Sequence, residues 1–320
     1  MNRIRKIAFE EHYTAPGFAD YSRAFIQHIP AELARYLGSR LSDFDEVRLR
    51  EMDEAGIDYV ILSQTGPGVQ GEADPAVAQR KAQENNDFLA AQVARHPTRY
   101  GAFDHLSMHD PLRAAKELER AVRQLGFKGA LVNGHTLGIY YDDRAYDPFW
   151  ETMQALDVPL YLHPIDPYQV PHAYGGHPEL VGASWGWGVE TATHALRLLF
   201  GGVFDRFPRL TVILGHMGEG LPFQRWRFDS RFAVYPHGVR LDRAPSEYIG
   251  SNIVITTSGV CSAATVAGAV AEMGAEAVMF SVDYPYESTA VAARFIEEAP
   301  LDERSRELVC HGNAKRLFKL

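Results

Sequence analysis

Short runs of hydrophobic residues recur along the chain, and each run ends in polar or turn-forming residues. Most of these runs are nearly continuous rather than alternating, which is typical of parallel strands buried on both faces. Eight runs fit this pattern and predict eight strands: Ile7–His12, Tyr59–Gln64, Tyr100–Leu106, Gly129–Asn133, Pro159–His163, Leu210–His216, Asn252–Ser258 and Val278–Asp283.

Segments with apolar residues at helical spacing separate these strands, and several end at a glycine or just before a proline. The predicted helices are Phe44–Ala55, Pro75–His96, Pro111–Leu125, Asp147–Leu156, Trp187–Phe204, Ser262–Met273 and Ser288–Ala299. Repeated alternation of strand and helix predicts a (β/α)₈ TIM barrel. A doubly wound open sheet is the alternative, but it fits fewer strands, and no glycine-rich dinucleotide motif follows any run.

Two segments interrupt the alternation. Thr14–Asp43 is an inserted segment after the first strand, and it is too rich in aromatic and apolar residues for a disordered linker. Ile165–Ser184 is a long loop after the fifth strand, and long ordered loops are often lids or binding loops. No linker rich in Pro, Ser or Gly divides the chain, so we expect one barrel domain over residues 1–320.

Composition excludes several classes of function. The chain has 320 residues and a net charge of -9, which disfavours binding to a nucleic-acid backbone. Its N-terminus lacks the apolar core of a signal peptide, and no apolar run reaches the length of a membrane span. The two cysteines, Cys261 and Cys310, form no C-x-x-C pair. We therefore expect a cytoplasmic protein with reduced thiols and with no nucleic-acid or membrane partner.

Ionisable residues gather where the predicted strands end. Glu10 and His12 lie two apart on the first strand, so they face the same side. His163, His216 and Asp283 end the fifth, sixth and eighth strands. In a (β/α)₈ barrel these strand ends converge on the C-terminal face, where active sites lie.

Each of these residues alone has a plainer explanation. His163 or His216 could be a satisfied structural histidine, and Asp283 could be a turn residue before Tyr284-Pro285. Together, two carboxylates and two imidazoles in one barrel mouth would cost several kcal/mol without a cation. We therefore predict a divalent metal site of Glu10, His12, His163 and Asp283, with a mixed N/O ligand set that suits Zn²⁺ or Mn²⁺.

The role of His216 stays open between a fifth ligand and a free acid or base. Glu219, three residues further on, could orient its imidazole as a hydrogen-bonding carboxylate does. Glu219 could equally cap the following helix.

Several motifs, taken together, resemble the amidohydrolase superfamily and, within it, the non-oxidative decarboxylases of dihydroxybenzoate and γ-resorcylate. The resemblance covers essentially the whole chain. The motifs are Glu10-Glu11-His12, Leu62–Gln70, Leu106–Pro111, Gly126–Asn133, Leu162-His163-Pro164, Leu214–Glu219, Thr256–Gly259, Phe280–Glu287 and Asn313–Leu320.

The resemblance implies functional roles for seven residues. Glu10, His12, His163 and Asp283 match the family's metal ligands, His216 and Glu219 match its histidine–carboxylate pair, and Arg227 matches an arginine near the substrate. Some relatives carry a non-ligating residue at the position of His12, so its presence favours true metal dependence. No strand-end lysine occupies the position of the bridging lysine in two-metal relatives, which fits a single ion.

The implied activity is decarboxylation of an ortho-hydroxybenzoate, in which Asp283 protonates the ring carbon before CO₂ leaves. The substrate stays open among 2,3-dihydroxybenzoate, γ-resorcylate, salicylate and 5-carboxyvanillate, and the resemblance implies a homotetramer or dimer. Two other functions compete. One is a metal-dependent hydrolase of a lactone or C–C bond from the same superfamily. The other is a catalytically inactive barrel that serves as a binding subunit.

Overall fold

The computed structural model describes residues 4–23 and 27–320. Its strands pair in parallel and in chain order, β1 to β3 in one sheet and β4 to β9 in the next. Only Phe103 separates β3 from β4, and its N–H bonds to Leu62 O of β2, so β3 and β4 act as one interrupted barrel strand. The strands are β1 (Lys6–Tyr13), β2 (Ile57–Gln64), β3 (Tyr100–Ala102), β4 (Asp104–His105), β5 (Ala130–Asn133), β6 (Leu160–His163), β7 (Val212–Leu214), β8 (Ile253–Thr256) and β9 (Val278–Met279).

The segment after β9 closes the barrel against β1. Asp283 donates its N–H to Glu10 O over 3.0 Å, and His12 donates to Tyr284 O over 2.7 Å. Glu11 and Tyr284 form an isolated parallel bridge. The eighth predicted strand therefore ends as a regular strand at Met279 but continues along β1 as far as Tyr284, which confirms the (β/α)₈ barrel.

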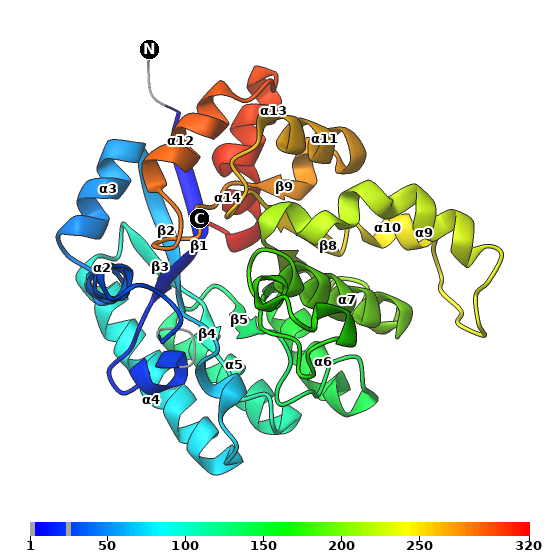
Figure 1. Cartoon of the computed structure of the whole chain (residues 1–320), viewed down its shortest axis with the longest axis horizontal. Coiled ribbons are helices and arrows are strands. Elements are labelled where there is room, and N and C mark those ends of the chain that lie inside the picture. Colours follow the sequence, from blue (N-terminus) through cyan, green and yellow to red (C-terminus); the bar gives the residue numbers. More distant parts are fainter. Residues whose placement is uncertain (1–3, 24–26) are drawn as a thin grey trace.

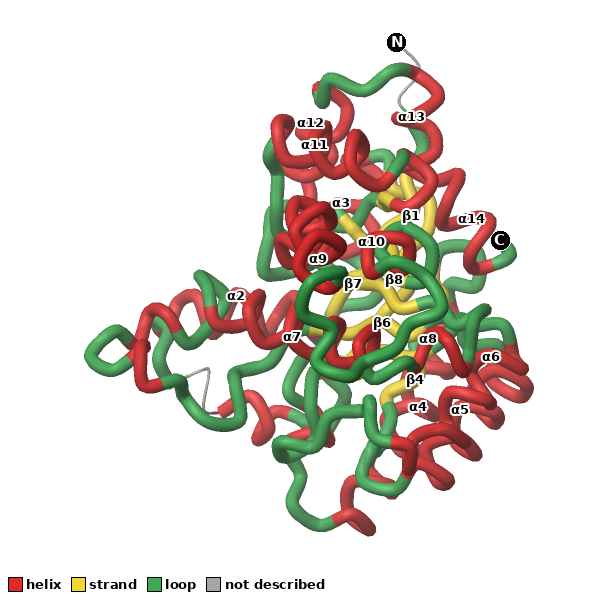
Figure 2. Tube along the Cα trace, turned by 90° about the vertical axis from the view of Figure 1, so that its right-hand side faces the viewer, coloured by secondary structure: helices red, strands yellow, loops and turns green. Residues whose placement is uncertain are grey.

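Helices surround the strands (Figures 1 and 2). Most match a predicted segment to within a few residues. They are α2 (Ala31–Leu41), α3 (Val47–Ala55), α4 (Pro75–Arg95), α5 (Pro111–Leu125), α6 (Asp147–Leu156), α7 (Gly186–Phe200), α8 (Val203–Arg206), α9 (Arg225–Phe232), α10 (Pro245–Tyr248), α11 (Ala263–Met273), α12 (Thr289–Glu298), α13 (Glu303–Glu307) and α14 (Asn313–Phe318).

Several elements differ from the sequence-based expectation. The single predicted helix Trp187–Phe204 is two helices, because the chain leaves α7 at Gly201 and Gly202 has a φ of 68°. The inserted segment contains α2, whereas 165–184 is a loop with two short 3-10 turns. The hydrophobic pattern also did not predict α9, α10, α13 and α14, of which α9 projects away from the barrel (Figure 1).

The N-terminal end of the barrel is filled by hydrophobic side chains. Phe9, Ile61, Leu131 and Ile213 belong to one buried cluster inside the barrel. α14 packs across this end, and the ring of Phe318 lies 5.0 Å from that of Phe9, centroid to centroid. The C-terminal ends of the strands lie at the opposite end of the barrel. Among the described residues, no helix combines the length and the apolar run that a membrane crossing needs.

Candidate metal centre

A β-bulge in β1 aims Glu10 and His12 into the barrel mouth. Between Ala8 and Glu11, β1 advances by three residues while its partner β2 advances by two. The extra residue reverses the alternation of side chains, so Phe9 points into the core while Glu10 and His12 also face inward and Glu11 faces outward. The bulge thus lets a strand that fills the core also supply two polar groups at its end.

Ser281 holds this bulge in place. The consecutive N–H groups of Phe9 and Glu10 both donate to its Oγ, each over 2.8 Å. Ser281 is buried, and it lies two residues before Asp283 on the segment that closes the barrel. One side chain therefore connects the strand that carries Glu10 and His12 to the segment that carries Asp283.

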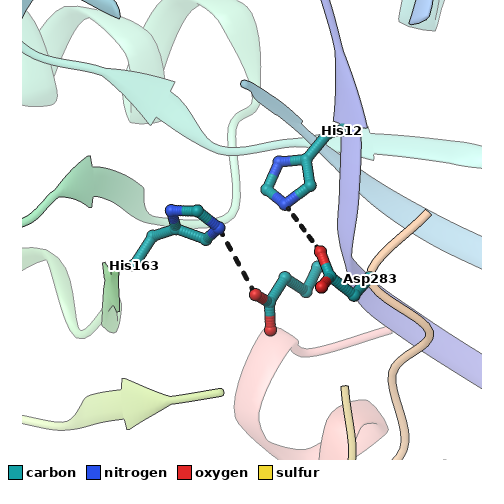
Figure 3. Close-up of side chains that lie close together, drawn as sticks. His12, His163 and Asp283 are labelled. Atoms are coloured by element: carbon teal, nitrogen blue, oxygen red, sulfur yellow. Dashed lines mark ion pairs between the residues drawn. The ribbon is translucent and has the colours of Figure 1, made fainter. Parts of the chain in front are cut away.

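The four predicted metal ligands meet at the C-terminal end of the barrel. One ligand atom from each of Glu10, His12, His163 and Asp283 lies within 4.8 Å of all the others. His12 Nε2 is 3.3 Å from Asp283 Oδ1, and His163 Nε2 is 3.5 Å from Glu10 Oε1. Figure 3 shows the rings of His12 and His163 converging with the carboxylate of Asp283, although the residues come from distant parts of the chain.

These contacts fit a shared cation better than direct hydrogen bonds. Glu10 Oε1 and His12 Nε2 are buried and have no hydrogen-bond partner among the described residues. Ligands about 2.1 Å from one metal ion lie about 3.0–3.4 Å from each other, close to the 3.3 Å between His12 and Asp283 and the 3.5 Å between His163 and Glu10. Burying unpaired polar atoms is costly, and a divalent ion removes that cost.

The outer nitrogens of the two histidines have partners that orient the rings. His163 Nδ1 donates to Pro164 O over 3.0 Å, which leaves the Nε2 lone pair directed at the cluster. His12 Nδ1 lies 3.1 Å from Ser63 Oγ. Burial, together with the neighbouring imidazole of His12, lowers the pKa of His163 well below its usual value. His163 is therefore neutral, which is the form that binds metals.

His216 and Glu219 form a pair beside the cluster. His216 Nδ1 is 2.8 Å from Glu219 Oε1, and Nε2 lies 3.6 Å from Glu10 Oε1 and 3.5 Å from Asp283 Oδ2. Burial alone would lower the pKa of His216, but the carboxylates of Glu10, Glu219 and Asp283 hold that pKa well above its usual value. His216 and Glu219 also have positive φ angles of 48° and 52°, and such strain is often found at functional sites.

Arg227 lies apart from these residues. It is exposed on α9, the helix that projects from the barrel, and its guanidinium makes no hydrogen bond or ion pair within residues 4–23 and 27–320. Its substrate-binding role therefore stays a prediction.

Sequence analysis missed a set of buried hydroxyls around Glu10. Tyr161 and Ser258 both donate to Glu10 Oε2, and Thr256 Oγ1 lies 3.0 Å from Tyr161 OH. A signal was present for Tyr161, because it precedes His163 by two residues on β6 and therefore shares its face.

Comparison with known proteins identifies the family. The family model described as Amidohydrolase matches residues 21–320. The chain belongs to the amidohydrolase family. A γ-resorcylate decarboxylase of Polaromonas sp. (strain JS666) is 45% identical, with 98% of each chain covered. This similarity places the protein among the decarboxylases of the amidohydrolase family, which makes it a carboxy-lyase.

Solved structures of such amidohydrolases share the fold. A 2,6-dihydroxybenzoate decarboxylase in complex with 2,6-dihydroxybenzoate has a TM-score of 0.94 and 42% identity, covering 99% of this chain and 100% of that one. A second structure is a dihydroxybenzoic acid decarboxylase of Polaromonas sp. JS666 with bound manganese and the inhibitor 2-nitroresorcinol. It has a TM-score of 0.93 and 45% identity, covering 99% of this chain and 97% of that one.

Proposed function

We propose that this protein decarboxylates an ortho-hydroxybenzoate without oxidation, at one divalent metal ion held by Glu10, His12, His163 and Asp283. The observation that carries the proposal is the convergence of their four ligand atoms within 4.8 Å, with Glu10 Oε1 and His12 Nε2 left without hydrogen-bond partners among the described residues. A bound divalent metal supplies Lewis acidity and a template for the carboxylate and phenolate oxygens of the substrate.

Asp283 is the proposed proton donor to the ring carbon that bears the carboxylate. Burial alone would raise its pKa, but the neighbouring imidazoles of His12 and His216 hold the pKa below its usual value. The resting group is therefore a carboxylate that takes up a proton before it can act. Protonation of the ring carbon interrupts aromaticity, and the electron pair of the breaking C–C bond restores it as CO₂ leaves.

His216 and Glu219 supply the route by which Asp283 regains its proton. His216 Nε2 lies 3.5 Å from Asp283 Oδ2, and Glu219 accepts from the other ring nitrogen. A histidine so placed can pass one proton to the carboxylate for each CO₂ released, and solvent returns one proton to its imidazole, which balances the reaction.

The substrate we propose is 2,6-dihydroxybenzoate, also called γ-resorcylate. The relative with 45% identity is named for this acid, and a structure with 42% identity contains it. Mn²⁺ is the proposed ion, because the Polaromonas structure contains manganese and a set of two imidazoles and two carboxylates suits that ion. Zn²⁺ accepts the same ligands and is the alternative.

Release of CO₂ from 2,6-dihydroxybenzoate tests the function. We expect turnover to stop when a chelator removes the metal and to return with added Mn²⁺, because the metal supplies the Lewis acidity and the template for the substrate. Zn²⁺ in a parallel sample tests the choice of ion.

Salicylate, 2,3-dihydroxybenzoate, 5-carboxyvanillate and a lactone complete the substrate panel. Lactone opening without CO₂ release would favour the hydrolase instead. No activity on any compound, in protein that has bound no metal after loading, would favour the inactive barrel.

A further inference from the structure

The two oxygens of the Glu10 carboxylate have different surroundings. Oε1 faces the metal cluster and lacks a hydrogen-bond partner among the described residues. Oε2 faces away and accepts hydrogen bonds from the hydroxyls of Tyr161 and Ser258. All three side chains are buried, so water does not compete for these bonds. Two hydroxyl donors on Oε2 leave Oε1 as the oxygen that Glu10 can offer to an ion.

Gly215 leaves the space that these groups occupy. A Cβ at this position would lie 2.6 Å from Glu10 Oε2 and 2.9 Å from both Ser258 Oγ and Tyr161 OH. The φ of Gly215 is -72°, which suits any residue, so backbone conformation gives no reason for glycine here. The space that the Glu10 carboxylate and its two hydroxyl donors need does explain the glycine.

Thr256 completes the hydroxyl set. Its Oγ1 lies 3.0 Å from Tyr161 OH and 2.9 Å from Ser258 Oγ. Tyr161 and Ser258 each have one hydroxyl proton, and both protons go to Glu10. The proton of Thr256 therefore goes to one of these two hydroxyl oxygens. Every member of the set is satisfied, which makes a buried polar network rigid.

Ser258 differs from Tyr161 in one contact. Its Oγ also accepts the backbone N–H of His216 over 3.1 Å. That N–H begins the stretch in which His216 and Glu219 have positive φ angles, so the contact holds a strained segment. One side chain thus touches both a candidate metal ligand and the backbone of the proposed proton carrier.

We infer that Ser258 is a positioning residue that couples the metal ligand Glu10 to His216, and that Tyr161 positions Glu10 alone. The part that concerns His216 in turnover rests on the proposed function. The part that concerns Glu10 and the metal does not, because metal affinity is measurable without any substrate.

The first experiment measures the dissociation constant for Mn²⁺ by competition with a chelating dye. Tyr161→Phe and Ser258→Ala each remove a donor from Glu10 Oε2, and loss of such a partner weakens metal binding about 10–100-fold. The matched control is Tyr146→Phe, which removes a buried hydroxyl that donates to Met108 O, away from the cluster. The control is expected to bind Mn²⁺ like the unmodified protein.

The second experiment separates the two positioning roles. In protein labelled with ¹⁵N-histidine, the backbone amide signal of His216, assigned with His216→Asn, is expected to shift more in Ser258→Ala than in Tyr161→Phe. At saturating Mn²⁺, kcat is expected to recover in Tyr161→Phe and to stay about 10-fold low in Ser258→Ala, with KM little changed. The NMR comparison works even if the protein turns over none of the substrates.

Unchanged Mn²⁺ affinity in both variants would overturn the assignment for Glu10. Equal amide shifts in the two variants, or equal kcat at saturating Mn²⁺, would overturn the coupling to His216. Gly215→Ala keeps the proposal testable if Tyr161→Phe or Ser258→Ala fails to fold. It retains every hydroxyl of the set but places a methyl group against Glu10. It is expected to weaken Mn²⁺ binding, and wild-type affinity in a folded Gly215→Ala protein would also contradict the assignment.

Discussion

At the scale of single residues, the proposed chemistry depends most on Asp283. Its φ of 77° is rare for a residue other than glycine, and its two oxygens face different partners. Oδ1 faces His12 and Oδ2 faces His216, at 3.3 Å and 3.5 Å. The same carboxylate can therefore contribute to the metal site with one oxygen and exchange a proton at the other. The strained backbone is what aims it between the two histidines.

Replacing Asp283 by asparagine separates the two roles. Asp283→Asn keeps the shape and one ligand oxygen but has no acidic proton. We expect the fold and most of the bound metal to remain, while kcat falls about 10²–10⁴-fold, the usual contribution of a positioned acid. Metal content, circular dichroism and CO₂ release on one sample check this. Asp302→Asn, at the exposed N-cap of α13, is the control, and full activity in Asp283→Asn would rule out Asp283 as the donor.

At the scale of elements, hydrophobic runs and strand-end chemistry were enough to predict most strands and the four converging side chains. The side to which Glu10 and His12 point was predicted correctly, but the β-bulge in β1 that orients them was not. A bulge depends on pairing with β2 and on Ser281, which lies 271 residues away from Glu10, and no local pattern reports such a contact. The break between α7 and α8 had a local signal in Gly201-Gly202.

Ser281→Ala tests whether the bulge positions the site. The substitution leaves the buried N–H groups of Phe9 and Glu10 without their acceptor, and each unsatisfied donor costs about 1–3 kcal/mol. We expect a lower free energy of unfolding in denaturant and weaker Mn²⁺ binding. Ser39→Ala, an exposed serine on α2, serves as control and should change neither. A Ser281→Ala protein as stable as the control would show that the bulge needs no such acceptor.

At the scale of the whole molecule, parallel strands in chain order bring β1 and the segment after β9 side by side, which places Glu10 next to Asp283. Strand and helix alternation predicted this arrangement, since closing a barrel pairs the first strand with the last. The projection of α9 was not predictable, because its packing depends on tertiary contacts. One domain over residues 1–320 and a homo-oligomer stay predictions.

Two buried histidines outside the site make the stability of the molecule depend on pH. His105 and His194 each accept a backbone N–H, from Val69 and Tyr141 respectively. Burial lowers the pKa of each to about 3, from 6.5, so both are neutral in the folded chain. The unfolded chain binds these protons first as the pH falls. The stabilisation is therefore complete above about pH 6.5 and is lost towards pH 3.

Each histidine is expected to cost about 1.4 kcal/mol of unfolding free energy per pH unit within that range. Urea unfolding of metal-free protein at pH 7 and pH 4.5 measures the loss. His194→Gln keeps an acceptor for Tyr141 but cannot be protonated, so it should lose roughly 2–3 kcal/mol less than the unmodified protein. Equal losses in the two proteins would contradict a neutral, buried His194.

The central claim is that four side chains from distant strands share one ion. Anomalous diffraction from crystals grown with Mn²⁺ tests it directly. We predict one strong peak at the C-terminal end of the barrel, about 2.0–2.3 Å from Glu10 Oε1, His12 Nε2, His163 Nε2 and an oxygen of Asp283. A peak held by other residues, or none at these four in fully loaded crystals, would contradict the account.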